Sequence, residues 1–236
     1  MRKADMSTET AFRYETHLHT RPVSKCSKID VRPALEFYRD RGYTGVFVTN
    51  HFLSGQVVMS NFSSYEELIE FYFSDYETAL SLAGEIGIQV LQGVEISLGG
   101  THFLVYGLRK EWFMAHSELL DMTDVEKLKL FRESGALVIQ AHPFRVTKST
   151  DFHRVFPMYS DGVEIYNGGN TELEDEMARK YADHYSLPHF AGTDFHGRQK
   201  RCLCGIEADR PFEDESEFIA MFKGGEVRCF TAEMTV

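Results

Sequence analysis

Five short apolar runs, spread over nearly the whole chain, each end in a histidine or a carboxylate. The ends of these runs read His17-Leu18-His19, Thr49-Asn50-His51, Gly93-Val94-Glu95, Gln140-Ala141-His142 and Thr193-Asp194-Phe195-His196. The carboxyl ends of barrel strands are where α/β barrels gather their catalytic groups, and imidazoles and carboxylates are the usual ligands of zinc, iron and manganese. The pattern therefore predicts one metal site assembled from the whole length of the protein.

The segments between these runs alternate between helical and extended patterns. Helices are expected over residues 31–41, with Asp30 as N-cap, and over 64–85, 124–134, 172–184 and 214–222. Strands are expected over 13–19, 45–50, 89–97, 102–106, 136–141, 162–166 and 188–192. Strands that alternate with long helices indicate βα units around a parallel sheet. Because candidate ligands follow nearly every strand, we predict a barrel of about seven strands rather than an open sheet, which gathers its ligands at one crevice.

The composition favours a single globular domain over residues 1–236. Of the 236 residues 43% are hydrophobic, and no low-complexity linker or repeat interrupts them. The formal net charge of −11 disfavours a long nucleic acid or an anionic membrane as partner. No apolar run approaches the ~20 residues that span a bilayer, and the start of the chain lacks a signal-peptide core. We therefore expect a cytoplasmic protein that acts on a small molecule, while the oligomeric state cannot be predicted.

Two pairs of candidate ligands are spaced two residues apart. His17 pairs with His19 in this way, and Asp194 pairs with His196. Alternate residues of a strand point to the same face, so each pair can reach one centre. His-x-His alone is a weak signal, because such pairs also occur by chance on polar strand edges. A second pair with the same spacing at the other end of the chain makes chance a poor explanation.

Four further side chains complete the candidate set. Glu95 lies inside an apolar run, where an unpaired carboxylate is costly to bury, so it either binds metal or forms a structural salt bridge. His51 and His142 each follow an apolar run, and the alternative for both is a solvated histidine at the start of a loop. His102 begins an apolar run and would turn inward beside Glu95.

These eight side chains are more than one ion needs from protein. A cluster of two or three divalent ions (zinc, iron or manganese) accounts for them, and such a cluster activates water for in-line attack on a phosphoryl group. Arg145, soon after His142, would grip a phosphate in a bidentate way, although a surface salt bridge explains it equally well. Arg198 is a weaker candidate for that role. We assign Arg145 and His196 to catalysis, with His196 able to protonate the leaving alcohol.

The remaining cysteines and histidines have simpler interpretations. Cys202-Leu203-Cys204 has one residue between its thiols and no second pair to complete a tetrahedral site, so reduced thiols on a strand or its edge are expected rather than a metal knuckle. The other histidines are interpreted as surface or structural residues: His116, His153, His184 and His189. His153 follows His142 in an irregular stretch and is the one of these that would line the cleft.

The candidate ligands and their surroundings resemble the PHP family, the polymerase-and-histidinol-phosphatase phosphoesterases. The resemblance runs from Glu15-Thr16-His17-Leu18-His19-Thr20 to Gly192-Thr193-Asp194-Phe195-His196-Gly197. It implies a distorted, TIM-like (β/α)7 barrel, a trinuclear metal site and hydrolysis of phosphate esters. It also implies that eight of the family's nine usual ligands are present: His17, His19, His51, Glu95, His102, His142, Asp194 and His196. Glu164 and Asn167 are expected near the cleft but not on metal.

The chain departs from the family's pattern at two positions. Many members carry an acidic residue or a histidine as a third ligand in the loop after the first pair. Cys26 stands at that place here, either as a thiolate ligand of a soft metal or as a sign that the ligand is missing. Asn50 stands where the family commonly has an aspartate, and the loss of that carboxylate would weaken the support of His51.

Three functions are compatible with these residues. The first is a metal-dependent phosphoesterase that hydrolyses a small phosphate ester by attack of a metal-bound hydroxide. The second is an amidohydrolase-type hydrolase, a group that also begins with His-x-His but usually ends on a lone aspartate and often carries a bridging lysine. The third is a non-catalytic metal-binding PHP module. The largely intact ligand set favours the first, with specificity expected from the irregular stretches 52–62 and 146–161, whose aromatic side chains would pack over a substrate or over one another.

Overall fold

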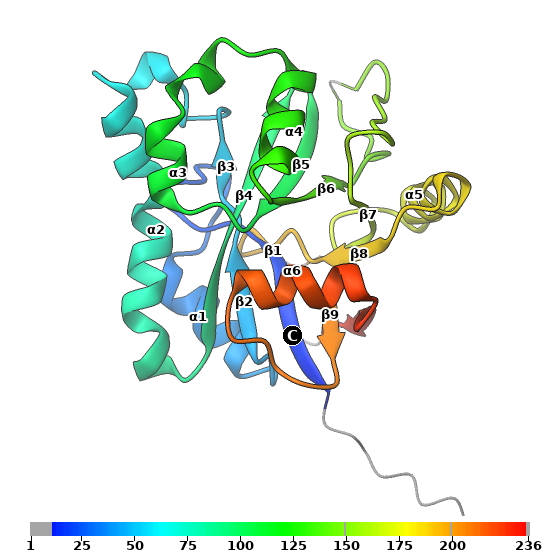
Figure 1. The fold of residues 1–236 in the computed structure, drawn as a ribbon. Helices are drawn as coiled ribbons and strands as arrows, with labels where there is room; N and C mark the ends of the chain where they lie inside the picture. The colour runs from blue at the N-terminus through cyan, green and yellow to red at the C-terminus, as the bar shows by residue number, and fades with distance from the viewer. Residues whose placement is uncertain (1–10, 149, 199, 235–236) are drawn as a thin grey trace, which may run out of the picture.

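The computed structural model describes residues 11–148, 150–198 and 200–234. A curved sheet runs through the middle of the molecule, and helices lie outside it (Figure 1). The start of the chain, on which the expectation about a signal peptide depended, lies outside the described residues. Among the described residues, no helix combines the length and apolar character that crossing a bilayer requires.

Seven strands form the wall of a barrel. In order around the wall they are β1 (Phe12–Leu18), β2 (Gly45–Val48), β4 (Gln89–Leu98), β5 (Thr101–Tyr106), β6 (Leu137–Ala141), β7 (Gly162–Asn167) and β8 (His189–Gly192). The wall nearly closes on itself after β8. There the His19 N–H donates to the Phe195 carbonyl at 3.0 Å, and the Phe195 N–H donates to the His17 carbonyl at 3.1 Å. The predicted distorted, TIM-like barrel is therefore confirmed.

One strand of the wall runs against the expected direction. β5 pairs antiparallel with both β4 and β6, and the turn Gly99-Gly100 joins it to β4. These glycines have φ values of 54° and 83°, which glycine adopts without the strain that a side chain would add. The expectation of a parallel sheet is wrong for β5, because a two-residue turn is too short for the crossover that parallel strands need.

The outer edge of β1 is shared by two partners. Its first half pairs antiparallel with β9 (Cys202–Ala208), and β9 pairs with β10 (Val227–Glu233), a strand that the sequence pattern did not predict. Its second half meets the segment after β8. Cys202 and Cys204 lie on β9, as predicted, with their sulfur atoms 3.3 Å apart. A short strand, β3 (His51–Phe52), adds to β4 at the other side of the barrel.

The five predicted helices are present, with ends that differ by at most two residues. They are α1 (Val31–Arg39), α2 (Tyr65–Ile86), α4 (Asp124–Glu133), α5 (Glu172–Tyr185) and α6 (Glu215–Gly224). The sequence pattern did not predict α3 (Lys110–Ala115) or the 3-10 turns η1 (Met59–Asn61) and η2 (Ser117–Leu120). Asp30 occupies the N-cap position of α1, but its carboxylate accepts from Arg21 at 2.6 Å instead of capping the helix.

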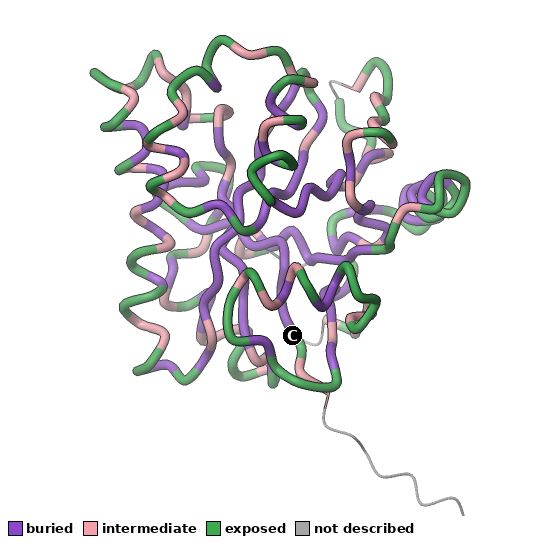
Figure 2. The backbone as a smooth tube through the Cα atoms, in the orientation of Figure 1, coloured by how far each residue is buried: buried purple, intermediate pink, exposed green. Residues whose placement is uncertain are grey.

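Aromatic side chains fill one end of the barrel. α6 crosses that end (Figure 1), and Phe218 and Phe222 pack with Phe47, Tyr106 and other wall residues. Figure 2 shows buried residues along the strands and exposed residues on the outer faces of the helices. Because side chains fill this end of the barrel, the opposite rim, where the parallel strands end, is the face available to a ligand.

Candidate metal centre

Eight side chains predicted as ligands converge at that rim. They are His17, His19, His51, Glu95, His102, His142, Asp194 and His196. They form four overlapping groups, and within each group the ligand atoms lie within 4.8 Å of one another. The convergence follows from the fold, because each side chain lies at or just beyond the end of a strand that reaches this rim.

His17 and His19 supply the deepest part of the cluster. His17 lies in β1 and His19 just beyond it, and both are completely buried. Their ring centroids are 5.0 Å apart. The spacing of two residues directs both rings into the barrel, as the strand period requires.

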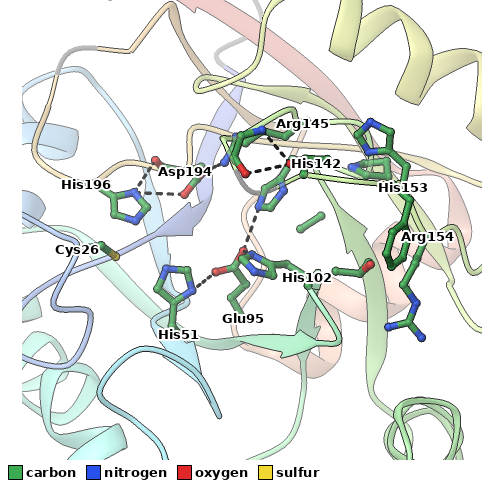
Figure 3. A pocket seen from close by; sticks show the side chains of 17 residues that line it. Cys26, His51, Glu95, His102, His142, Arg145, His153, Arg154, Asp194 and His196 are labelled. Atoms are coloured by element: carbon green, nitrogen blue, oxygen red, sulfur yellow. Dashed lines mark hydrogen bonds and ion pairs between the residues drawn. The ribbon is translucent and has the colours of Figure 1, made fainter.

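Glu95 lies at the centre of the cluster, on β4. Its Oε1 is 3.2 Å from Nε2 of His17, 3.0 Å from Nδ1 of His102 and 3.1 Å from Nε2 of His142. Its Oε2 contacts His51 and lies 3.5 Å from Nε2 of His19. Figure 3 shows this carboxylate between His51, His102 and His142. One carboxylate that reaches five imidazoles has the arrangement of a group able to bridge two ions.

The reversed direction of β5 explains how His102 reaches Glu95. The carboxyl ends of the parallel strands lie at the rim, so the rim receives the amino end of an antiparallel strand. His102 is the second residue of β5 and pairs across the sheet with Ala141, just before His142. His102, at the start of one apolar run, therefore lies beside His142, at the end of another.

Asp194 divides its two oxygen atoms between the cluster and an arginine. Its Oδ1 lies 3.3 Å from Nε2 of His19 and 3.3 Å from Nδ1 of His196, while its Oδ2 accepts from Arg145. One oxygen atom therefore faces the histidines, while the guanidinium fixes the other.

Cys26 lies at the outer edge of the cluster. The rings of His51 and His196 each lie 4.3 Å, between centroids, from the ring of His19. Figure 3 shows the Cys26 sulfur directed toward the space between His51 and His196. Burial would raise the pKa of this thiol, but hydrogen bonds with His196 and His51 outweigh burial and lower the pKa to about 6. A thiolate at neutral pH is the form that binds metal.

The backbone is strained at two of the candidate ligands. His142 has a φ of 27° and Asp194 a φ of 55°, values that residues with a side chain seldom adopt. Each such conformation costs on the order of 1–3 kcal/mol and persists only where the surroundings enforce it. Strain at the two positions where side chains turn into the rim is typical of a functional site.

Four buried polar atoms of the cluster make no hydrogen bond of normal geometry, although each lies within ion-pair distance of an opposite group of the cluster. They are Nε2 of His17, Nε2 of His19, Nδ1 of His51 and Oε2 of Glu95. A buried polar atom without a partner costs about 1–3 kcal/mol, so four in one place call for an explanation. Metal ions in the shared space would satisfy all four, and the residues present therefore fit a metal cluster.

Comparison with known proteins gives structural matches only. No protein-family model matches the chain, and no curated protein does. A two-domain protein from Bacteroides vulgatus, described as containing a predicted PHP-like metal-dependent phosphoesterase, is 15% identical, with a TM-score of 0.67 over 94% of this chain and 65% of that one. A candidate metal-dependent phosphoesterase from Bifidobacterium adolescentis is 14% identical, with a TM-score of 0.56 over 79% of this chain and 88% of that one. The chain has the fold of the PHP-like phosphoesterases.

A third solved structure shares the PHP-like fold under another name. It is an amidohydrolase from Chromobacterium violaceum, solved with sulfate and without metal, at 14% identity and a TM-score of 0.51 over 91% of this chain and 97% of that one. The chain spans 65% of the length of the Bacteroides protein, less than two thirds. At these identities the likeness establishes the PHP-like fold, and the activity has to be argued from the site.

Side chains behind the cluster hold its histidines in place. Oε1 of Glu164 lies 2.8 Å from Nδ1 of His17, and its Oε2 accepts from the His142 N–H at 2.9 Å and from Asn167 at 2.8 Å. Glu164 and Asn167 thus lie beside the cleft, as expected. Ser24, which the sequence pattern did not single out, lies 3.2 Å from Nδ1 of His19. Such contacts fix which ring nitrogen faces the metal side.

Asn50 supports the loop after β1 rather than the ring of His51. Its Oδ1 accepts from the Thr20 N–H at 2.8 Å, and its Nδ2 donates to Oδ2 of Asp75 at 3.1 Å. Asp75, on α2, also accepts from the Thr20 hydroxyl at 2.8 Å. The amide therefore anchors the loop after β1 to a buried carboxylate. None of the hydrogen bonds described for the Asn50 side chain goes to the ring of His51.

Burial and neighbouring charge shift the pKa values of the central groups. Burial opposes the charge on Glu95, but the surrounding histidines, His51 first, hold the pKa of Glu95 well below its usual range. Burial, followed by the charge of Arg145, lowers the pKa of His142 to about 4. An ionised carboxylate and a neutral imidazole are the forms in which these groups bind metal.

A hollow of about 430 Å³ opens above the cluster. Its outer wall comes from one of the two stretches predicted for specificity and includes Phe152, His153 and Arg154 (Figure 3). Phe152 is 70% exposed at this wall. The other predicted stretch contributes less, because Phe52 is fully buried and packs against Tyr72 in the core, not over a ligand. His116, His184 and His189 lie outside this hollow, as expected.

Arg145 is held on three sides. It donates to Asp194 and Asn167, and its Nε donates to Asn170 at 2.9 Å. A surface salt bridge does not describe this residue, because its side chain is largely buried and its carboxylate partner belongs to the cluster. Two of its five N–H groups remain for a ligand, and Arg145 lines the hollow.

Proposed function

We propose that the protein is a metal-dependent hydrolase that cleaves the phosphate ester of a small molecule. The observation that carries the proposal is the set of orphaned buried polar atoms that face one another among eight ligand-type side chains. The PHP-like fold supports it, since one solved protein with this fold is described as containing a predicted metal-dependent phosphoesterase and another as a candidate one.

Two or three divalent ions suit the donors, because the four groups share members and cannot each hold a separate ion. One ion would lie between His17, His19 and Asp194. A second would lie between Glu95, His102 and His142. A third would need His51 and His196, with Cys26 as a further donor. Mixed imidazole and carboxylate donors suit zinc, iron or manganese, and a thiolate favours zinc.

The ions would supply Lewis acidity to the phosphoryl oxygens and lower the pKa of a water molecule to near neutrality. Arg145 would donate its two free N–H groups to a phosphoryl oxygen while it holds Asp194 in place. If two ions bind, His196 is free to give a proton from its ring to the leaving alcohol. If three bind, His196 is a ligand and that proton comes from water.

Amide hydrolysis is the second candidate, because one solved protein with this fold is named an amidohydrolase. Among the described residues, no lysine lines the hollow above the cluster. The bridging position belongs to Glu95, whereas amidohydrolases often use a lysine there. This difference favours the phosphate ester.

Metal analysis together with an activity assay tests the proposed function. Protein purified without chelator is expected to hold two or three equivalents of zinc, iron or manganese and to release phosphate from a panel of small phosphomonoesters. Removal of the metal should abolish turnover, and adding back manganese or zinc should restore it. If the folded protein neither retains nor regains metal, only the interpretation as a non-catalytic module would remain. Turnover of amides without turnover of phosphate esters would establish the second candidate.

The Cys26→Ala substitution tests the donor set of the third ion. We expect the metal content to fall by about one ion per chain, because the imidazoles of His51 and His196 without the thiolate leave a tetrahedral site incomplete. The matched control is Cys229→Ala, which removes a thiol from β10, away from the rim. Metal content is measured by elemental analysis. An unchanged content in Cys26→Ala would mean that Cys26 is not a ligand.

A further inference from the structure

A second hollow, of about 470 Å³, adjoins the first at the same rim. Cys26, Arg145, Asp194 and His196 line both hollows, so the second opens directly onto the candidate metal ligands. A molecule held at the cluster can therefore extend into either hollow.

The second hollow is lined by positive charge in an acidic protein. The chain has a formal net charge of −11, yet this hollow is lined by four cationic side chains and one carboxylate, Asp194. The cations are Arg145, Arg198, Lys200 and Arg201. Such a concentration of one charge sign in a hollow attracts an anion.

Two of these four cations are already neutralised and two are not. Arg145 is paired with Asp194, and Arg201 is paired with Asp175. Within the part of the chain that the structure describes, neither Arg198 nor Lys200 has a carboxylate within ion-pair distance. Both side chains line the second hollow, so both cations are available to a ligand there.

The loop after β7 brings two cations close together. A Cβ at Gly169 would lie 2.9 Å from Nη2 of Arg145 and 3.1 Å from Nζ of Lys200, so both cationic groups lie against the same glycine. Arg145 is neutralised by Asp194, and the ammonium beside it lacks such a partner.

We propose that Arg198 and Lys200 form a subsite for a second phosphoryl group of the substrate. The inference rests on the proposed function, since the first phosphoryl group would sit at the metal cluster. A phosphoryl group matches the two unpaired cations, because it carries close to two negative charges and several acceptor oxygens, whereas a carboxylate carries one charge. The substrate class is then a small molecule with two phosphate groups, one hydrolysed and one held.

Calorimetric binding of non-hydrolysable phosphonates to the metal-loaded protein tests this subsite. The probes are methylphosphonate, four alkane bisphosphonates with one to four linking carbons, and 3-phosphonopropionate. We expect at least one bisphosphonate to bind about tenfold more tightly than methylphosphonate, because a second set of charge-assisted hydrogen bonds forms. This gain exceeds the factor of about two expected from having two equivalent groups. In Arg198→Gln/Lys200→Gln the ratio should fall to about two.

The matched control is Arg179→Gln/Lys180→Gln on α5, which removes the same charge from exposed side chains and should keep the tenfold ratio. Bisphosphonates that bind no better than methylphosphonate would overturn the subsite and leave the proposed function standing. A gain that persists in Arg198→Gln/Lys200→Gln would overturn the assignment to these residues. An equal gain for 3-phosphonopropionate would replace the second phosphoryl group by a carboxylate. A failure of methylphosphonate itself to bind would overturn the proposed function and the subsite together.

Discussion

Replacing Glu95 with glutamine is expected to lower phosphate-ester turnover by roughly a thousandfold and to lower the metal content. The carboxylate contacts five imidazoles around one space, so its charge acts on more than one ion position. Metal ions supply several kcal/mol of transition-state stabilisation, and each 1.36 kcal/mol is a factor of ten in rate, which gives the expected size. A glutamine keeps the shape but presents a neutral oxygen and an N–H₂ group to the ions.

The measurements for Glu95→Gln are metal content by elemental analysis, kcat for a phosphomonoester and far-UV circular dichroism. The matched control is Glu133→Gln, which removes an exposed carboxylate at the end of α4 and should leave all three unchanged. A folded Glu95→Gln protein with full metal content and full activity would show that this carboxylate is a structural partner of the histidines.

The strand-end pattern was sufficient to predict most of the cluster. His17 and Glu95 end or interrupt apolar runs, and a barrel has one rim at which the ends of its parallel strands meet. The strand-end pattern alone did not predict the direction of β5, although the Gly99-Gly100 turn before it is too short for a parallel crossover and indicates an antiparallel hairpin with β4. His102 reaches Glu95 because β5 is antiparallel, which brings the amino end of this strand to the rim.

Residues that support the cluster were harder to predict than the ligands themselves. Ser24 contributes through a hydrogen bond with His19. Asp75, on α2, contributes by accepting a hydrogen bond from Asn50, a residue 25 positions away in the sequence. A serine in a polar loop and an aspartate in an amphipathic helix look like solvated residues. Only the three-dimensional packing of α2 against the loop after β1 shows that both are buried.

The burial of aromatic residues in the irregular stretches was also hard to predict from the sequence. Phe52 and Phe152 both belong to stretches expected to be irregular, yet Phe52 is completely buried and Phe152 is 70% exposed at the hollow. Phe52 belongs to β3, whose pairing with β4 carries it into the core. A two-residue strand leaves no periodicity in the sequence, so the burial of Phe52 and the exposure of Phe152 could not be predicted from it.

Replacing Glu164 with glutamine is expected to weaken metal binding by about 10- to 100-fold without removing a ligand. One carboxylate oxygen faces Nδ1 of His17, and the other accepts from the His142 N–H and from Asn167. An amide has only one acceptor oxygen, so its N–H₂ group must face either the imidazole or two donors. Burial of such a mismatched group also costs about 1–3 kcal/mol of folding stability.

Two measurements separate positioning of the histidines from a structural role of Glu164. The first is the metal dissociation constant, by competition with a chromogenic chelator, and the second is the free energy of unfolding of the metal-free protein in urea. The matched control is Glu172→Gln, an exposed carboxylate in the first turn of α5, which should change neither. Positioning predicts weaker metal binding together with a lower kcat at unchanged KM. A loss of unfolding free energy with unchanged metal affinity would show that Glu164 only fills the barrel, because its contacts would then not set the direction in which His17 and His142 face.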